Sequence, residues 1–117
     1  LTEKTITHGD IIIGAIPIGG FRMVDNGEAD DKIIAVMHTD GLYSQWRDIG
    51  DCPPAFIDRL KHYFLTYKDL PGSSDRLCEI TGVYNREEAL EVIRRARQDY
   101  LEKFPHLESL MQDMFED

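Results

Sequence analysis

The sequence predicts an α+β fold, in which an antiparallel sheet or part of a small barrel is followed by two amphipathic helices. Two observations support this class. β-branched residues dominate short runs between residues 10 and 37, and turn-rich segments connect these runs. Apolar residues then recur at helical spacing over about 54–67 and 86–104. A chain of 117 residues accommodates one domain at most.

Three strands are expected in the first third of the chain. Asp10–Ile18 is rich in isoleucine and predicts the first strand, which Gly19-Gly20 is expected to end. Phe21–Val24 alternates bulky and polar residues and predicts the second strand. Lys32–Met37 predicts the third, after an acidic loop that contains the strong turn dipeptide Asn26-Gly27.

A helix is expected to begin at the two prolines before residue 55, since proline is tolerated in a first helical turn. Residues 38–53 before it are predicted as a loop, with a short helical turn near 41–46. The apolar stripe of the helix comprises Phe56, Ile57, Leu60, Tyr63, Phe64 and Tyr67. Arg76–Val83 predicts one further short strand.

The second helix is expected to begin after Asn85, a good N-cap with Glu88 three residues later, and to run to about Phe104. Its predicted apolar stripe comprises Ala89, Leu90, Ile93, Ala96, Tyr100, Leu101 and Phe104. The interpretation therefore divides the chain into 1–104 and a C-terminal tail, 105–117, whose spacing allows a short amphipathic helix.

Charge and hydropathy exclude two classes of protein. Lys and Arg number 13 against 22 Asp and Glu, a net charge of −9, so no basic stripe is present for general nucleic-acid binding. The longest apolar run, Ile11–Ile18, is interrupted by Gly14 and Pro17 and is far shorter than the roughly 18 residues that span a membrane. Cys52 and Cys78 have no zinc-finger or disulfide-framework spacing, which favours reduced thiols and a cytoplasmic location.

The acidic loop carries the densest set of candidate functional groups. Asp25, Glu28, Asp30 and Asp31 lie within seven residues, and Lys32 follows them. Mg²⁺ takes oxygen ligands and is often held by one or two carboxylates together with waters and substrate phosphates. A hairpin that brings two of these aspartates together would offer such a pair. The alternative interpretation is a solvated acidic turn.

A second candidate group is Tyr67-Lys68 at the end of the first helix, where a phenol and an ammonium could clamp a phosphate. The alternative is that the tyrosine closes the apolar stripe and the lysine complements the helix C-terminus. The four histidines are scattered, and the sequence contains no P-loop, zinc-protease, nucleophile-elbow or dinucleotide-binding motif.

Four motifs in order resemble the soluble family I inorganic pyrophosphatases: Asp25-x4-Asp30-x-Lys32 followed by Ile-Ile-Ala-Val, Pro17-Ile18-Gly19 with Phe21-Arg22-Met23 before it, Asp48-x2-Asp51-Cys52-Pro53, and Tyr67-Lys68-Asp69-Leu70. The resemblance implies a small five-stranded, OB-like barrel with flanking helices. It implies hydrolysis of pyrophosphate with Mg²⁺, for which Mn²⁺ or another divalent metal could substitute.

The resemblance also implies residue roles. Asp25 and Asp30 would be metal ligands, and together with Lys32 they would form the catalytic group. Lys32, Tyr67 and Lys68 would contact the phosphates of the substrate, while a metal-bound water attacks phosphorus.

The chain lacks the family's upstream Asp-Gly-Asp-Pro-x-Asp motif, so it resembles the C-terminal portion of such an enzyme. We therefore expect weak activity or none from the chain alone. The alternative is a non-catalytic fragment that binds phosphate or metal, or that serves in oligomer assembly. Family members form trimers and hexamers, which makes His62 and Asp69 candidate oligomer contacts, although Thr66 stands where a second histidine is common.

Overall fold

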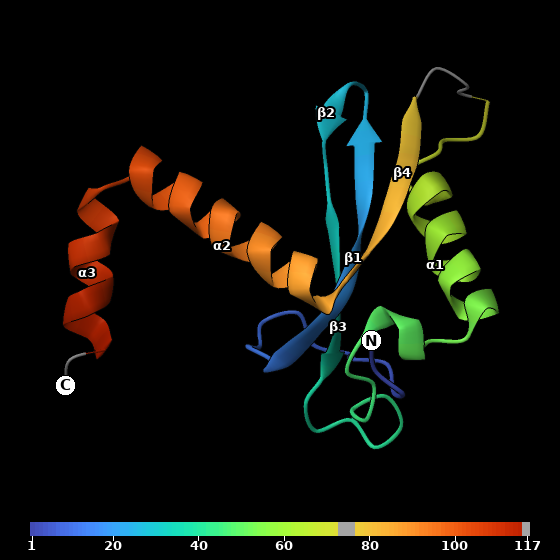
Figure 1. Ribbon diagram of the computed structural model, residues 1–117, viewed down its shortest axis with the longest axis horizontal. Coiled ribbons are helices and arrows are strands. Elements are labelled where there is room, and N and C mark those ends of the chain that lie inside the picture. The colour runs from blue at the N-terminus through green and yellow to red at the C-terminus, as the bar shows by residue number, and fades with distance from the viewer. Residues whose placement is uncertain (73–76, 116–117) are drawn as a thin grey trace.

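The computed structural model describes residues 1–72 and 77–115, which form an open antiparallel sheet with helices on both sides (Figure 1). The elements in order are β1 Ala15–Asp25, β2 Glu28–Ala29, β3 Lys32–Met37, the 3₁₀-helix η1 Ile49–Asp51, α1 Pro54–Thr66, β4 Cys78–Asn85, α2 Arg86–Lys103 and α3 His106–Phe115. Mixed α and β structure with an antiparallel sheet agrees with the predicted class. The described residues do not close into a five-stranded barrel.

β1 is the central strand and pairs with the three others. β2 and β3 continue one another along one edge of β1, while β4 pairs along the opposite edge. The prediction of two strands, at Asp10–Ile18 and Phe21–Val24, was therefore wrong: one strand of 11 residues begins at Ala15. Residues 10–14 have no strand partner, and Ile12 is fully exposed.

Gly19 and Gly20 lie within β1 because β4 approaches it closely there. A Cβ atom at Gly19 would lie 2.6 Å from the carbonyl oxygen of Tyr84, and one at Gly20 would lie 2.4 Å from the Tyr84 ring. Glycine pairs in sequence usually end a strand, but here the missing side chains make room for a neighbour. A register shift between Pro17 and Gly19 is accommodated in the same stretch.

The two faces of the sheet follow from strand alternation. Phe21 on β1, and Ile34 and Val36 on β3, are buried on the face that α1 covers, where the Phe21 and Phe64 rings meet edge to face at 6.0 Å. The core also contains Ile18, Ile49 and Cys52, with partly buried side chains of α1 packed against it: Phe56, Ile57, Leu60 and Phe64.

α2 packs its first turns against β1 and then leaves the sheet, so that its second half and α3 project away from the other elements (Figure 1). Of the predicted apolar stripe only Ala89 is buried, whereas Leu90, Ile93 and Tyr100 are exposed. The stripe is therefore not a core-facing surface in this structure. Among the described residues no helix has the length and apolar character that a membrane span requires.

The loop before α1 contains turns over 41–45 and η1 in place of the predicted helical turn. Asp48 and Asp51 form a capping box on η1, and the Asp48 carboxylate also accepts a hydrogen bond from the Arg86 backbone N–H at 3.0 Å. This second bond joins the loop to the first turn of α2. The spacing of these two aspartates thus has a local structural role.

Candidate active site

A tight hairpin turn places Asp25 at the end of the sheet. Asn26 and Gly27 both have positive φ, 51° and 82°, as a type I′ turn requires, and Asp25 pairs with Glu28 across it. The Asn26 N–H also donates to the Leu77 carbonyl at 2.7 Å, which attaches the turn to the start of β4. The turn predicted from Asn26-Gly27 is confirmed.

Asp30 and Lys32 lie where β2 passes into β3. The Asp30 N–H donates to the Met23 carbonyl at 2.8 Å, which places Asp30 beside β1 two residues before Asp25. At about 3.4 Å per residue, the two aspartate backbones are separated by roughly 7 Å along the strand. The Lys32 ammonium forms an ion pair of 2.5 Å with the Asp30 carboxylate, and the lysine side chain is only 19% exposed.

Asp25 and Lys32 share one face of the sheet. Lys32 pairs directly with Phe21, and residues in register point to the same side; Asp25 follows Phe21 at an even spacing. That is the face covered by α1. Because Lys32 reaches Asp30, the two aspartates and the lysine belong to the same end of the same face.

Lys68, just after α1, places a second ammonium group at this end. The Lys68 ammonium lies 3.4 Å from an Asp25 carboxylate oxygen, although the two residues are 43 positions apart in sequence. Tyr67 stacks on the Tyr63 ring at 5.1 Å, and the Lys68 ammonium lies 5.6 Å from the centre of the Tyr67 ring. The sequence-predicted groups Asp25, Asp30, Lys32 and Lys68 thus form two ion pairs, and Tyr67 lies next to one of them.

Asp25 and Asp30 do not form a closed metal cage. Within the parts of the chain that the structure describes, no group of three or more His, Cys, Asp or Glu side chains is arranged to hold a metal ion. Two carboxylates nevertheless suit Mg²⁺, which retains waters and binds substrate phosphates. The donor set therefore fits a partial magnesium site that needs further oxygen ligands.

The remaining predicted residues lie elsewhere. His62 on α1 and Asp69 after it are exposed, and the structure holds no partner chain against which to place them. Cys52 is buried in the core, and burial raises the pKa of its thiol. A thiol in this environment is a poor nucleophile.

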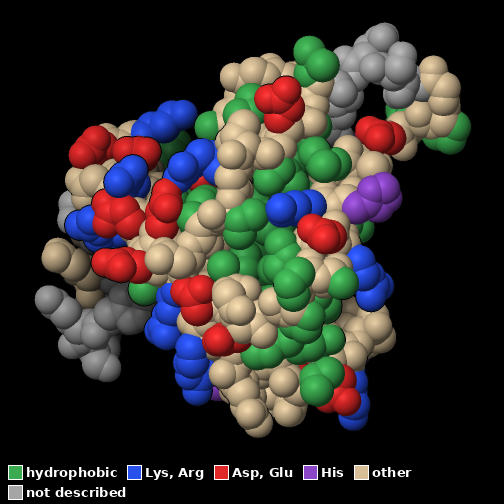
Figure 2. All heavy atoms as spheres, turned by 45° about the vertical axis from the view of Figure 1, so that its right-hand side comes forward, with side chains coloured by type: hydrophobic (Ala, Val, Ile, Leu, Met, Phe, Trp, Pro, Cys, Tyr) green, Lys and Arg blue, Asp and Glu red, His purple; other side chains and the backbone are tan. Residues whose placement is uncertain are grey.

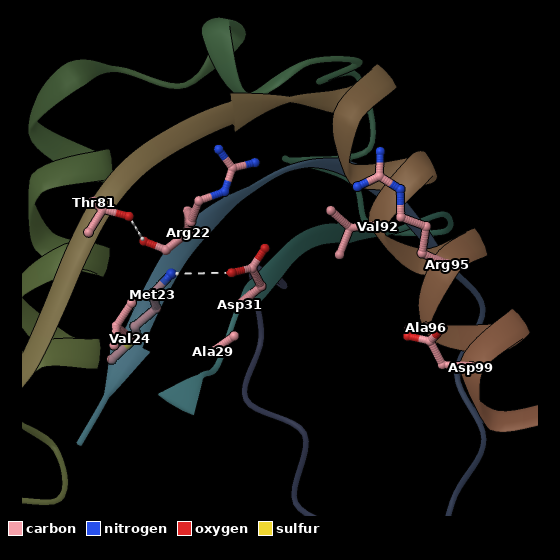
Figure 3. A pocket seen from close by; sticks show the side chains of 10 residues that line it. All are labelled: Arg22, Met23, Val24, Ala29, Asp31, Thr81, Val92, Arg95, Ala96 and Asp99. Atoms are coloured by element: carbon pink, nitrogen blue, oxygen red, sulfur yellow. Dashed lines mark hydrogen bonds between the residues drawn. The ribbon is translucent and has the colours of Figure 1, made fainter. Parts of the chain in front are cut away.

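A polar pair next to this site, the half-buried Asp31 and the buried Tyr84, was not predicted from the sequence. The Tyr84 hydroxyl donates to Asp31 at 3.1 Å, and burial together with that carboxylate raises the pKa of Tyr84 to about 12. The signal available in the sequence was Gly19-Gly20 inside a strand pattern, which indicates close approach of another group. Figure 3 shows Asp31 on the opposite face of the sheet, in the groove beneath α2.

The family model described as inorganic pyrophosphatase matches residues 1–101. The chain belongs to the inorganic pyrophosphatase family. An inorganic pyrophosphatase of Chlamydia caviae is 53% identical over 109 residues, which cover 89% of this chain and 50% of the relative; that of Chlamydia muridarum is 51% identical over 108 residues, covering 89% and 52%.

Solved inorganic pyrophosphatases share the fold. The crystal structure of the Thermus thermophilus protein matches with a TM-score of 0.71 and 30% identity, over 80% of this chain and 53% of the other. The Helicobacter pylori protein matches with a TM-score of 0.66 and 32% identity, over 75% and 52%. This chain thus spans about half the length of the inorganic pyrophosphatases that it matches.

Proposed function

We propose that this chain carries part of the active site of an enzyme that hydrolyses inorganic pyrophosphate to two phosphates with Mg²⁺. The observation that supports this most directly is the pair of carboxylate–ammonium contacts, Asp25 with Lys68 and Asp30 with Lys32, at one end of one sheet face. Anionic ligands for a metal and cationic ligands for phosphate thus alternate within one small region.

In this proposal Asp25 and Asp30 hold Mg²⁺ or a substituting divalent ion such as Mn²⁺. The bound metal would supply Lewis-acid activation of water and neutralise phosphate charge. Each carboxylate now contacts a lysine ammonium, so metal binding would displace the ammonium groups from the aspartates. The lysines would then be released toward the phosphates that accompany the metal.

Lys32, Lys68 and Tyr67 are the proposed phosphate ligands. The two ammonium groups approach the site from different elements, β3 and the end of α1, and so can contact different oxygens of one substrate. Tyr67 adds a phenol donor. Placed cations stabilise charge that develops on the leaving phosphate, which is a major source of catalysis in phosphoryl transfer.

The five-stranded barrel is also part of the proposal. The Leu1 nitrogen donates to the Ala35 carbonyl at 2.5 Å and the Met37 N–H donates to the Leu1 carbonyl at 3.2 Å. These two bonds flank Val36 in the pattern of a parallel pairing. We infer that a strand from the rest of a pyrophosphatase domain runs parallel to β3 along this edge, beginning near Lys32.

The molecule also exposes apolar surface on the side where α1 and β4 lie. Figure 2 shows hydrophobic side chains gathered in a nearly continuous band through the middle of one face. An exposed patch of this kind indicates a surface that contacts more protein. Assembly into a trimer or hexamer with His62 and Asp69 at the contact, and a cytoplasmic location, remain predictions within this proposal.

The alternative is a fragment that binds metal or phosphate, or that takes part in oligomer assembly, without catalysis. The specific observation in its favour is that the described residues hold no group of three or more metal-ligating side chains. In that case the chain binds Mg²⁺ weakly, and joining it to the first half of a relative restores no release of phosphate from pyrophosphate.

Isothermal titration of the 117-residue chain with Mg²⁺, and with pyrophosphate in the presence of Mg²⁺, tests the proposal. Asp25→Asn and Asp30→Asn should each weaken Mg²⁺ binding, whereas Asp58→Asn, on the exposed side of α1, should not. Equal Mg²⁺ affinity in all three variants would contradict the assignment of the metal ligands.

A further inference from the structure

A side chain on the opposite face of the sheet holds the segment that bears Asp30 and Lys32. Asp31 lies between these two residues, and alternation directs its side chain toward the groove beneath α2 (Figure 3). One Asp31 oxygen accepts the Met23 backbone N–H at 3.3 Å. The other accepts the Tyr84 hydroxyl at 3.1 Å.

The hydrogen bond from the Met23 N–H to Asp31 lies where β1 has no backbone partner on this edge. The pairing of β1 with β3 ends at Phe21, and its pairing with β2 begins at Val24. In the interval the Asp31 carboxylate takes the place of a backbone acceptor for Met23, while the Asp30 N–H donates to the Met23 carbonyl at 2.8 Å. The path of the chain through Asp30 therefore depends on where the Asp31 carboxylate is held.

Tyr84 is itself rigidly placed. Its side chain is buried, with only 5% of the residue exposed, and its ring lies over Gly20, where a side chain would collide with it. The Arg22 guanidinium lies 5.5 Å from the ring centre and is paired with Glu88 of α2. Because packing fixes the ring, the hydroxyl is a fixed anchor for the carboxylate.

We propose that Tyr84 is a positioning residue, which acts through Asp31 to hold Asp30 and Lys32 in the geometry that binds metal and phosphate. The consequences of this role for metal and phosphate binding rest on the proposed function. The mechanical part, the restraint of Asp30 by Tyr84 through Asp31, is independent of that function. Tyr84 and Asp31 contact neither substrate nor metal in this account.

Tyr84→Phe removes the hydroxyl and keeps the ring. Asp31→Asn leaves one acceptor oxygen for two donors, the Met23 N–H and the Tyr84 hydroxyl, which now bond to separate oxygens. Amide hydrogen exchange of the 117-residue chain, followed by NMR, should show the Asp30 amide exchanging about tenfold faster in either variant, since a bond to a charged acceptor is lost. Core amides of β3 should change much less. Tyr100→Phe, on the exposed part of α2, is the matched control and should leave Asp30 unchanged.

The double variant distinguishes positioning from general stability. If Tyr84 acts through Asp31, the double variant should exchange at Asp30 no faster than the faster single variant. The proposal would be overturned if the effects of Tyr84→Phe and Asp31→Asn on exchange at Asp30 add fully in the double variant. It would also be overturned if the exchange rate at Asp30 rises only as much as the rates of all core amides.

Mg²⁺ titration of the same proteins separates this proposal from the proposed function. We expect Mg²⁺ affinity to fall several-fold in both single variants and to remain unchanged in Tyr100→Phe. Wild-type affinity in the Tyr84 and Asp31 variants overturns the positioning role and leaves the proposed function intact. Absence of Mg²⁺ binding in the wild-type chain contradicts the proposed metal site, and the exchange rates at Asp30 then decide the positioning role alone.

Discussion

Replacing Gly20 by alanine tests the close packing of β4 on β1. A Cβ atom at this position would lie 2.4 Å from Cε2 of Tyr84, and 2.6 Å from both its Cζ and its hydroxyl oxygen. Ordinary contacts between carbon atoms lie at about 3.5–4.0 Å, so the ring must move by roughly 1 Å. The ring is buried, and such a movement also displaces the hydroxyl from Asp31.

The expected cost follows from these terms. Overpacking of a core costs typically about 1–3 kcal/mol. Weakening a hydrogen bond to a charged group adds about 1 kcal/mol or more. The lower entropy of an unfolded chain with alanine in place of glycine offsets about 0.4–1 kcal/mol. We therefore expect the free energy of unfolding to fall by about 1.5–3 kcal/mol, measured by urea denaturation with circular dichroism.

Gly82→Ala is the matched control, because it lies on β4 opposite Arg22 and its nearest neighbour, the Arg22 Cβ, is at 3.9 Å. That distance is an ordinary contact, so the free energy of unfolding should change by about 0.5 kcal/mol or less. In a Tyr84→Ala background, the cost of Gly20→Ala should largely disappear. Equal losses of unfolding free energy in Gly20→Ala and Gly82→Ala, or an unchanged loss for Gly20→Ala in the Tyr84→Ala background, would show that the Tyr84 ring is not what restricts position 20.

Three further predictions concern charge and capping. Lys32→Met and Lys68→Met should each weaken pyrophosphate binding in the presence of Mg²⁺ by about tenfold, measured by titration calorimetry, whereas unchanged affinity in both would reject their role as phosphate ligands. Backbone N–H donors, first those of Glu3 and Tyr43, hold the pKa of Asp40 below its ordinary 3.8. The stability that the ionised Asp40 carboxylate contributes is therefore complete above pH 3.8 and is lost as the pH falls through its lower pKa in the folded state. The thermal denaturation temperature of Asp40→Asn should therefore depend less on pH in that range. Asn85→Ala should lower the free energy of unfolding by about 1 kcal/mol in urea, since its side chain caps α2.

The helices and the acidic turn were predictable because their signals are local. α1 begins at Pro54 as the proline pair indicated, Asn85 caps α2, and Asn26-Gly27 forms the hairpin turn. Each of these depends on the conformational preference of a few adjacent residues. The sequence also indicated which residues lie at the turn, and that carboxylates and lysines there could bind metal and phosphate.

The errors arose where distant residues decide the structure. Gly19-Gly20 was expected to end a strand, but the ring of Tyr84, more than 60 positions later, uses the space they leave. The apolar stripe of α2 was expected to face a core, but Tyr100 is exposed because α2 leaves the sheet after its first turns. The contact of Lys68 with Asp25 was not predicted: the resemblance implied only that the two residues belong to one active site, and spacing along the chain does not encode their contact.

Phosphate release from pyrophosphate in the presence of Mg²⁺ tests the central claim, that this chain carries one part of a pyrophosphatase active site. The measurement is made on the 117-residue chain alone and on the same chain joined to the first half of the Chlamydia caviae relative, which it matches at 53% identity. We expect little or no release from the chain alone, and release by the joined protein that Asp25→Asn and Asp30→Asn each abolish. Near-normal turnover by the chain alone, or turnover by the joined protein that survives both substitutions, would contradict it.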